Sequence, residues 1–120
     1  MAAIKLTFKL SQDDYEGIVD TAGSGISYWA VQGHIDNTGE GDAYKSYTVV
    51  DGYGKERTKR KITRAGMERA IVGLFKERKL NKYYMDAIDQ LVLRGCSGDV
   101  GSDIADAIVQ QAMFGEVVYG

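Results

Sequence analysis

The chain has 120 residues, a formal net charge of −2, 15 glycines and no proline. This length is typical of one domain that buries a hydrophobic core, and 44% hydrophobic with 27% charged residues is typical of a soluble globular protein. No apolar run approaches a transmembrane helix, and the first ten residues lack the pattern of a secretory signal. Cys96 is the only cysteine, which excludes an internal disulfide and suits a reducing cytoplasm. The chain has only one histidine and one cysteine, too few for a structural zinc site, and we expect no metal and no cofactor.

Charge is distributed unevenly along the chain. Residues 1–54 hold three Lys against eight acidic residues, a balance of −5, and residues 55–94 hold twelve Lys and Arg against five acidic residues, a balance of +7. Residues 95–120 hold four acidic residues and no base, a balance of −4, so the three blocks sum to −2. Segregation of this kind bears on partners and surface potential more than on the fold.

The chain up to residue 25 is expected to begin with a strand. Apolar and polar residues alternate over Ile4–Leu10, which predicts a strand with one buried face. Short polar side chains at Ser11–Asp14 predict a cap or turn, followed by a short turn or helix over Asp13–Val19. Two glycines in three residues predict a loop over Thr21–Gly25.

The next segments predict a run of strands that completes the sheet. Ile26–Ile35 is rich in β-branched and aromatic residues and predicts a strand, and Asn37–Asp42 predicts a turn. Tyr44–Val50 predicts another strand, with a hairpin turn at Asp51–Gly54. The returning strand over Lys55–Ile62 is almost wholly polar and is expected at a sheet edge.

From residue 63 the apolar residues recur with the period of a helix. Thr63 is expected to cap a first helix, and Asn81 a second one that ends at Gly95. A third helix, capped by Ser102 or Asp103 and ended by Gly115, is apolar over most of its circumference. A short strand over residues 117–119 is expected to join the sheet.

These elements predict a single α+β domain over residues 1–120, with 1–62 mainly strands and 63–120 mainly helices. We expect an N-terminal antiparallel sheet of about four strands followed by three helices packed on one face. The nearly all-apolar third helix is expected to be central in the fold, or buried in a homodimer if the monomer does not cover it.

A run of basic residues is the most distinctive surface feature of the sequence. On a strand, Lys55, Arg57, Lys59 and Lys61 would project from one face and Arg60 from the other. Three interpretations stay open: a solvated edge strand, a protein-binding surface, or a nucleic-acid surface on which Tyr53 stacks a base. An isoelectric point near 5.3 argues against a general nucleic-acid binder. The candidate basic patch comprises Tyr53, Lys55, Arg57, Lys59, Arg60, Lys61 and Arg64.

Three carboxylates crowd the start of the third predicted helix: Asp99, Asp103 and Asp106. Carboxylates at this place complement the helix dipole, and together they form a candidate acidic patch for a basic partner. Their spacing does not match a calcium-binding loop, and we assign no metal to them.

No set of residues points to catalysis, so we expect no enzyme. His34 is the only histidine, and Asp36, two residues away on the same strand face, offers a local salt bridge. Cys96 lies in a Gly/Ser loop without a nearby base in sequence. Of Tyr28 and Trp29, adjacent on one strand, only one is expected to point inward.

Two segments resemble a family of small uncharacterised proteins of tailed bacteriophages and prophages. One is Gly25–Ala30, which reads GISYWA, and the other is Asp103–Gly120, which ends ADAIVQQAMFGEVVYG. The helix that begins at Thr63 is similar too, whereas the basic run Lys55–Lys61 is not part of the pattern. The resemblance implies a viral gene product that acts in the host bacterial cytoplasm, and it brings no catalytic residue.

The leading hypothesis is therefore a phage-encoded, non-enzymatic binding protein that engages a host protein assembly. Inhibition of a bacterial defence system, such as a CRISPR effector or a restriction enzyme, is the task that we expect. Segregated charge and abundant tyrosine favour such docking, because complementary charge orients an encounter and tyrosine is common at interfaces. The alternative is a nucleic-acid-binding accessory protein that uses the basic segment 55–64. Neither hypothesis involves a membrane.

Overall fold

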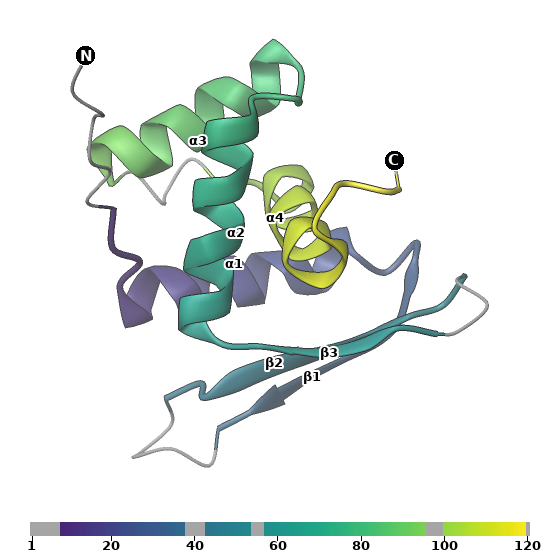
Figure 1. Ribbon diagram of the computed structural model, residues 1–120. Coiled ribbons are helices and arrows are strands. Elements are labelled where there is room, and N and C mark those ends of the chain that lie inside the picture. The colour runs from purple at the N-terminus through teal and green to yellow at the C-terminus, as the bar shows by residue number, and fades with distance from the viewer. Residues whose placement is uncertain (1–7, 38–42, 54–56, 96–99, 120) are drawn as a thin grey trace.

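The structure is a computed structural model that describes residues 8–37, 43–53, 57–95 and 100–119. Four helices lie on one side of a three-stranded antiparallel sheet and leave its other side open (Figure 1). This arrangement confirms the predicted α+β class. The elements in chain order are α1 (Gln12–Gly25), β1 (Ala30–Asp36), β2 (Ser46–Asp51), β3 (Lys59–Ile62), α2 (Arg64–Glu77), α3 (Lys82–Arg94) and α4 (Ser102–Phe114).

The sheet has the strand order β1-β2-β3, and its two faces differ in chemistry. Val49 of β2 pairs with Arg60 and Tyr47 pairs with Ile62, which places these four residues on the face toward the helices. Tyr47, Val49 and Ile62 are all buried there. The open face carries polar residues, because Thr48 pairs with both His34 and Lys61 and the side-chain period of a strand is two.

The segment before the sheet is more helical than its sequence predicts. Ser11 caps α1 by accepting a hydrogen bond from the Asp14 amide at 3.1 Å, as expected of the polar run there. The helix then continues to Gly25, so the predicted loop over Thr21–Gly25 is wrong. One face of α1 packs into the core. The free energy gained by burying these apolar side chains exceeds the roughly 1 kcal/mol by which each glycine destabilises a helix. The residues of that face are Tyr15, Ile18, Val19 and Ala22.

The strands begin later than their sequences predict. The segment Ile26–Trp29 forms a turn in which the amides of Trp29 and Ala30 both donate to the Ile26 carbonyl, so β1 begins at Ala30. The returning strand covers only Lys59–Ile62 of the predicted Lys55–Ile62. The first predicted strand lies outside the described residues up to position 7, and residues 8–10 are not in a strand. The predicted turn over residues 37–42 is described only at position 37.

The three later helices occur where the sequence predicts them, with two corrections at α4. Thr63 and Asn81 cap α2 and α3, and Gly95 ends α3 in the left-handed conformation with φ of 66°. The N-cap of α4 is Gly101, which offers no side chain, so the predicted cap at Ser102 or Asp103 is wrong. Residues 117–119 form no strand, and pack as a tail against the sheet and α4 instead.

Helix α4 is the centre of the fold, as its apolar circumference predicts. It contacts α1, α2, α3 and β3, and Figure 1 shows it enclosed between the sheet and the other helices. Because the monomer itself covers this helix, the condition under which we expected a homodimer is not met. The buried residues of α4 are Ile104, Ala105, Asp106, Ala107, Ile108, Val109, Gln110, Gln111 and Met113.

Candidate functional site

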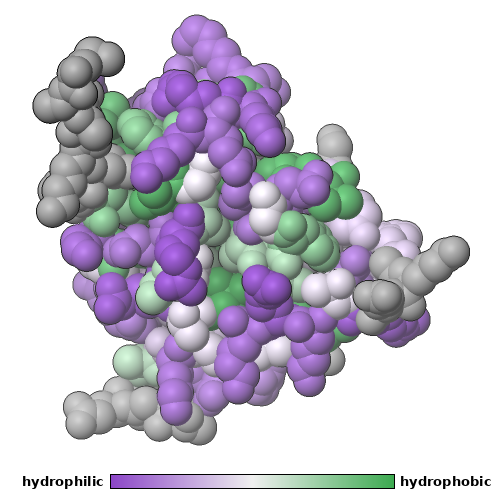
Figure 2. Space-filling model, viewed as in Figure 1, coloured by the Kyte–Doolittle hydropathy of each residue, from purple (hydrophilic) through white to green (hydrophobic). Residues whose placement is uncertain are grey.

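The described basic residues gather where β3 leads into α2, and we call this set the basic surface. Lys59 and Lys61 project from the open face of the sheet, whereas Arg60 lies on the face toward the helices. Figure 2 shows hydrophilic side chains along α2 and the sheet below it. The basic surface comprises Lys59, Arg60, Lys61, Arg64 and Arg69, all of them exposed.

The basic surface differs from the predicted patch at its ends. Lys55 lies outside the described residues, and Arg57 precedes β3 in a left-handed conformation with φ of 46°, so it does not continue the strand alternation. Tyr53 is 72% exposed and its ring lies 6.0 Å from that of Tyr119. The predicted division of faces therefore applies, within the described strand, to Lys59 and Lys61 against Arg60.

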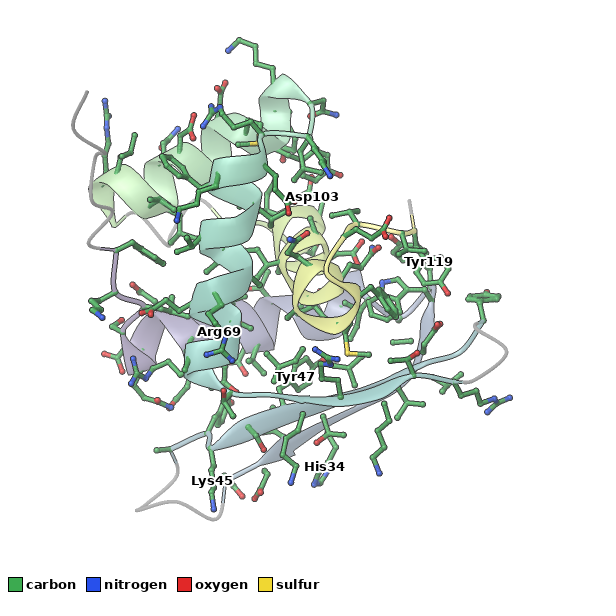
Figure 3. All side chains as sticks on the ribbon, in the orientation of Figure 1. His34, Lys45, Tyr47, Arg69, Asp103 and Tyr119 are labelled. Atoms are coloured by element: carbon green, nitrogen blue, oxygen red, sulfur yellow. The ribbon has the colours of Figure 1, made fainter. Side chains whose placement is uncertain are left out.

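A pocket of about 260 Å³ lies within the basic surface, between β3, the first turns of α2 and the far end of α4. Arg60 and Lys61 line it from the sheet, and Arg69 lines it from α2. Figure 3 shows Arg69 at the end of α2 nearest the sheet. A Cβ on Gly66 would lie 3.7 Å from Nη2 of Arg69, so this guanidinium folds back toward the start of α2. The other lining residues are Ile62, Thr63, Gly66, Ala70, Gln111 and Ala112.

The electrostatics of this pocket are one-sided. Among the described residues, none that lines it is acidic, and the first turn of α2 carries no acidic residue, although a helix N-terminus favours negative charge. The side chains of Arg60 and Arg69 make no hydrogen bond or ion pair with any residue that the structure describes. Arg64 is partly used within the fold, because it donates to the Leu10 carbonyl at 2.9 Å. Two guanidinium groups without a counter-charge therefore line one pocket.

A second polar arrangement lies inside the protein and centres on Asp106 of α4. Its Oδ1 accepts hydrogen bonds from the indole of Trp29 at 2.7 Å and from Nε2 of Gln110 at 2.9 Å. Its Oδ2 accepts from the hydroxyl of Tyr28 at 2.6 Å. Burial, and then this hydrogen bond, raise the pKa of Tyr28 to about 12. Three neutral donors thus satisfy a carboxylate that is only 8% exposed.

Gln110 extends this network to the tail that follows α4. Its Oε1 accepts from the amides of Val118 and Tyr119 at 2.8 and 2.7 Å, and its Nε2 donates to the Tyr119 carbonyl at 3.1 Å. The Tyr119 ring stacks on Trp29, with centroids 5.5 Å apart, and its hydroxyl donates to Asp51 of β2 at 2.9 Å. Phe114 packs on the same indole at 5.7 Å.

The two segments that carry the phage-family resemblance therefore meet in space. Tyr28 and Trp29 come from the first segment, and Asp106, Gln110 and Tyr119 from the second. The contacts among them are internal, so these residues hold the fold together. Only one of the adjacent Tyr28 and Trp29 points inward, as the sequence predicts: Trp29 is 1% and Tyr28 47% exposed.

Within the described residues, Asp106 does not belong to a surface patch as predicted. Asp106 is buried and fully bonded, because it faces the core side of α4, and Asp99 lies outside the described residues. Asp103 is half-buried, and its hydrogen bond from the Tyr83 hydroxyl raises the pKa of Tyr83. In Figure 3, Asp103 lies near α3, well away from the sheet that carries the basic residues.

The remaining candidates do not assemble into a catalytic site within the described residues. His34 is exposed on the open sheet face, opposite Thr48, and points away from the helices (Figure 3). Cys96 lies outside the described residues. The part of the chain that the structure describes holds no group of three His, Cys, Asp or Glu residues arranged to bind a metal.

Two residues that matter here are not among the candidates that the sequence indicates. Arg69 lies on α2, and nothing in one sequence shows that the helix face that carries it meets β3. Gln110 was passed over within an apolar helix, although a lone amide at a buried position is a signal that it bonds internally.

Comparison of this chain with protein-family models, curated proteins and solved structures finds no match. In the described residues, every helix is too short or too polar to cross a lipid bilayer.

Proposed function

We propose that the protein is a non-enzymatic binding protein whose basic surface engages the phosphates of a nucleic acid. One observation carries this proposal: Arg60 and Arg69 line one pocket and have no counter-charge among the described residues. Exposed cations without a counter-charge on the protein can neutralise phosphates, and this neutralisation is the main source of affinity for nucleic acid. Lys59, Lys61 and Arg64 extend the same surface.

The net charge of −2 does not oppose this function, because the charge is segregated along the chain and on the molecule. The positive balance of +7 falls in residues 55–94, which include β3 and α2. The candidate acidic patch favoured docking to a basic protein surface. It no longer includes Asp106, because that residue is buried. Between the two hypotheses from sequence, the geometry therefore supports the nucleic-acid alternative better.

The experiment is the salt dependence of binding to short DNA and RNA, single- and double-stranded, measured by fluorescence anisotropy. For roughly four to five phosphate contacts, the logarithm of the association constant should fall with that of salt concentration with a slope of about −3 to −4.5. Lys59→Ala with Lys61→Ala should reduce the slope by about 1.5 to 2. Absent or salt-insensitive binding to every nucleic acid contradicts the proposal.

A matched control removes the same charge elsewhere. Lys76→Ala with Lys79→Ala removes two exposed lysines, one in the last turn of α2 and one just after that helix, away from the pocket. This pair should leave the slope nearly unchanged, since at physiological salt charges act over only about 8 Å. An equal loss in both double variants would mean that the basic surface is not the binding site.

A second candidate function is favoured by exposed tyrosines. Tyr28, Tyr53 and Tyr83 are 47%, 72% and 61% exposed, and large exposed aromatic residues are typical of protein interfaces. With the phage resemblance, they support a protein that engages a host assembly, as an inhibitor of a CRISPR effector or restriction enzyme in the bacterial cytoplasm. The test is DNA cleavage by such a purified effector with and without the protein, and with Tyr83→Ala. Cleavage that is unaffected in each system contradicts this candidate.

A further inference from the structure

The pocket in the basic surface has the chemistry of an anion site. A guanidinium group presents a planar fork of N–H donors that matches two oxygens of a phosphate, and Arg60 and Arg69 bring two such groups to one cavity. Lys61 also borders the pocket, but its side chain projects from the opposite face of the sheet. None of the described residues that line the pocket is a carboxylate that could compete for the two arginines.

The charges around the pocket are unfavourable in the free protein. Like charges repel, and these cations also lie near the positive end of the α2 dipole, where Thr63 already caps the Gly66 amide at 3.1 Å. A bound anion relieves both repulsions at once. The two arginine side chains carry this argument, and the helix end only adds to it.

The size and surroundings of the pocket narrow the ligand. A volume of about 260 Å³ is below the range of sites that enclose a whole small-molecule ligand, but it admits a phosphate group. Gly66 keeps the floor open, since a methyl group there would contact both Thr63 Oγ1 and Arg69 Nη2. The positive surface continues past the pocket through Lys59 and Arg64, which suits a chain of repeating phosphates better than one isolated phosphate.

We propose that this pocket holds one backbone phosphate of a nucleic-acid strand between Arg60 and Arg69, an inference that rests on the proposed nucleic-acid function. The neighbouring cations then follow the strand without discriminating among its bases. The pocket sets where the strand lies on the protein, since phosphate contacts fix register and orientation rather than sequence.

The test compares single-charge variants within the basic surface. Arg60→Ala and Arg69→Ala each remove a pocket residue, and Lys59→Ala removes the same charge from the opposite face of the sheet. For an oligonucleotide of about twelve nucleotides, each arginine variant should weaken binding at least about tenfold, and the lysine variant only a few-fold. All three side chains are exposed, so the variants should fold as the native protein does.

A second readout locates the ligand. Titration with the oligonucleotide should shift the NMR signals of the Gly66 amide and the Arg69 Nε–H. One strand with a neutral methylphosphonate at each position in turn should lose affinity sharply at one or two positions only.

Two outcomes overturn the inference, and they differ in what they mean for the proposed function. If the native protein binds the oligonucleotide and all three variants lose affinity equally, the pocket is not a phosphate site, although the proposed function stands. If no nucleic acid binds, while a phosphoserine peptide binds and is lost in Arg69→Ala, the ligand is a protein and the proposed function fails with the inference.

Discussion

Asp106 is the residue on which the interior depends most, because its carboxylate accepts hydrogen bonds from three side chains. Its oxygens hold the Trp29 indole, the Tyr28 hydroxyl and the Gln110 amide. A carboxylate at this burial is tolerated because hydrogen bonds replace its water shell. The residue acts on the fold, and not on a partner as its acidic neighbours in sequence suggested.

Asp106→Ala should lower the free energy of unfolding by about 3 kcal/mol, since it leaves the buried Trp29 indole N–H without an acceptor and removes one acceptor each from Tyr28 and Gln110. Asp106→Asn is the matched control, because its Oδ1 still accepts from Trp29 and Gln110, and it should cost about 1 kcal/mol. Urea denaturation measures both. A loss below 1 kcal/mol for the alanine variant would mean that the network contributes little.

Alkaline pH should destabilise the protein through Tyr15. Burial, with a smaller contribution from Glu16, raises the pKa of Tyr15 to about 12, against about 10 in the unfolded chain. Between these values the folded state binds more protons than the unfolded state, so this stabilisation is complete below about pH 10 and is lost as pH rises toward about 12. The difference in unfolding free energy between the native protein and Tyr15→Phe should therefore shrink over that range. A constant difference would contradict the raised pKa.

Residue-scale prediction from sequence succeeds where one neighbour decides, and fails where tertiary contacts decide. That only one of Tyr28 and Trp29 points inward follows from their adjacency, whereas the choice of Trp29 does not. The role of Asp106 does not follow from the sequence. A carboxylate in the second turn of an apolar helix can compensate the helix dipole or accept hydrogen bonds in the core, and the sequence looks the same in both cases. Its partners Tyr28 and Trp29 lie more than seventy positions earlier in the chain.

At the scale of elements, α1 shows how packing overrides local preference. Gly23 and Gly25 favour a loop, yet the buried face of the helix keeps both in helical conformation. The caps of α2 and α3 are local side-chain hydrogen bonds, which is why Thr63 and Asn81 could be identified from sequence. The late start of β1 depends on a turn made by backbone hydrogen bonds to Ile26, which leave no side-chain signal.

Gly17→Ala should stabilise the protein by about 0.5 to 1 kcal/mol, because a Cβ there meets nothing within 4 Å and alanine is the better helix former. Gly25→Ala, eight residues later in the same helix, should instead destabilise it by more than about 1 kcal/mol, since its Cβ would press on the Ser102 backbone. Thermal unfolding of the two variants checks the contrast. The same sign for both would refute the packing assigned to α1.

At the scale of the whole molecule, one feature stabilises the fold and another offers a binding surface. The core network closes the fold around Trp29, and the basic surface lies apart from it at the junction of β3 and α2. The sequence predicts the α+β class and the segregated charge because both are written in patterns along the chain. It does not predict the pocket, because Arg60 and Arg69 become neighbours only when the sheet and α2 pack together.

Gln110→Ala should free the tail without unfolding the domain. The amides of Val118 and Tyr119 both donate to this side chain, so their hydrogen exchange should accelerate strongly. Gln111→Ala is the control on the same helix, since the Gln111 side chain bonds to Glu77 at 3.5 Å and to no tail amide among the described residues. Equal exchange in the two variants would show that aromatic stacking on Trp29 suffices to hold the tail.

The stacking of Tyr119 on Trp29 also orders events in time. The indole is made early in synthesis, and the residues that cover it are among the last of these 120 to leave the ribosome. Until then a large aromatic surface stays open, and its closure spans about ninety positions, a separation that slows folding. Because Trp29 is the only tryptophan in the sequence, its fluorescence reports the time at which that final step occurs.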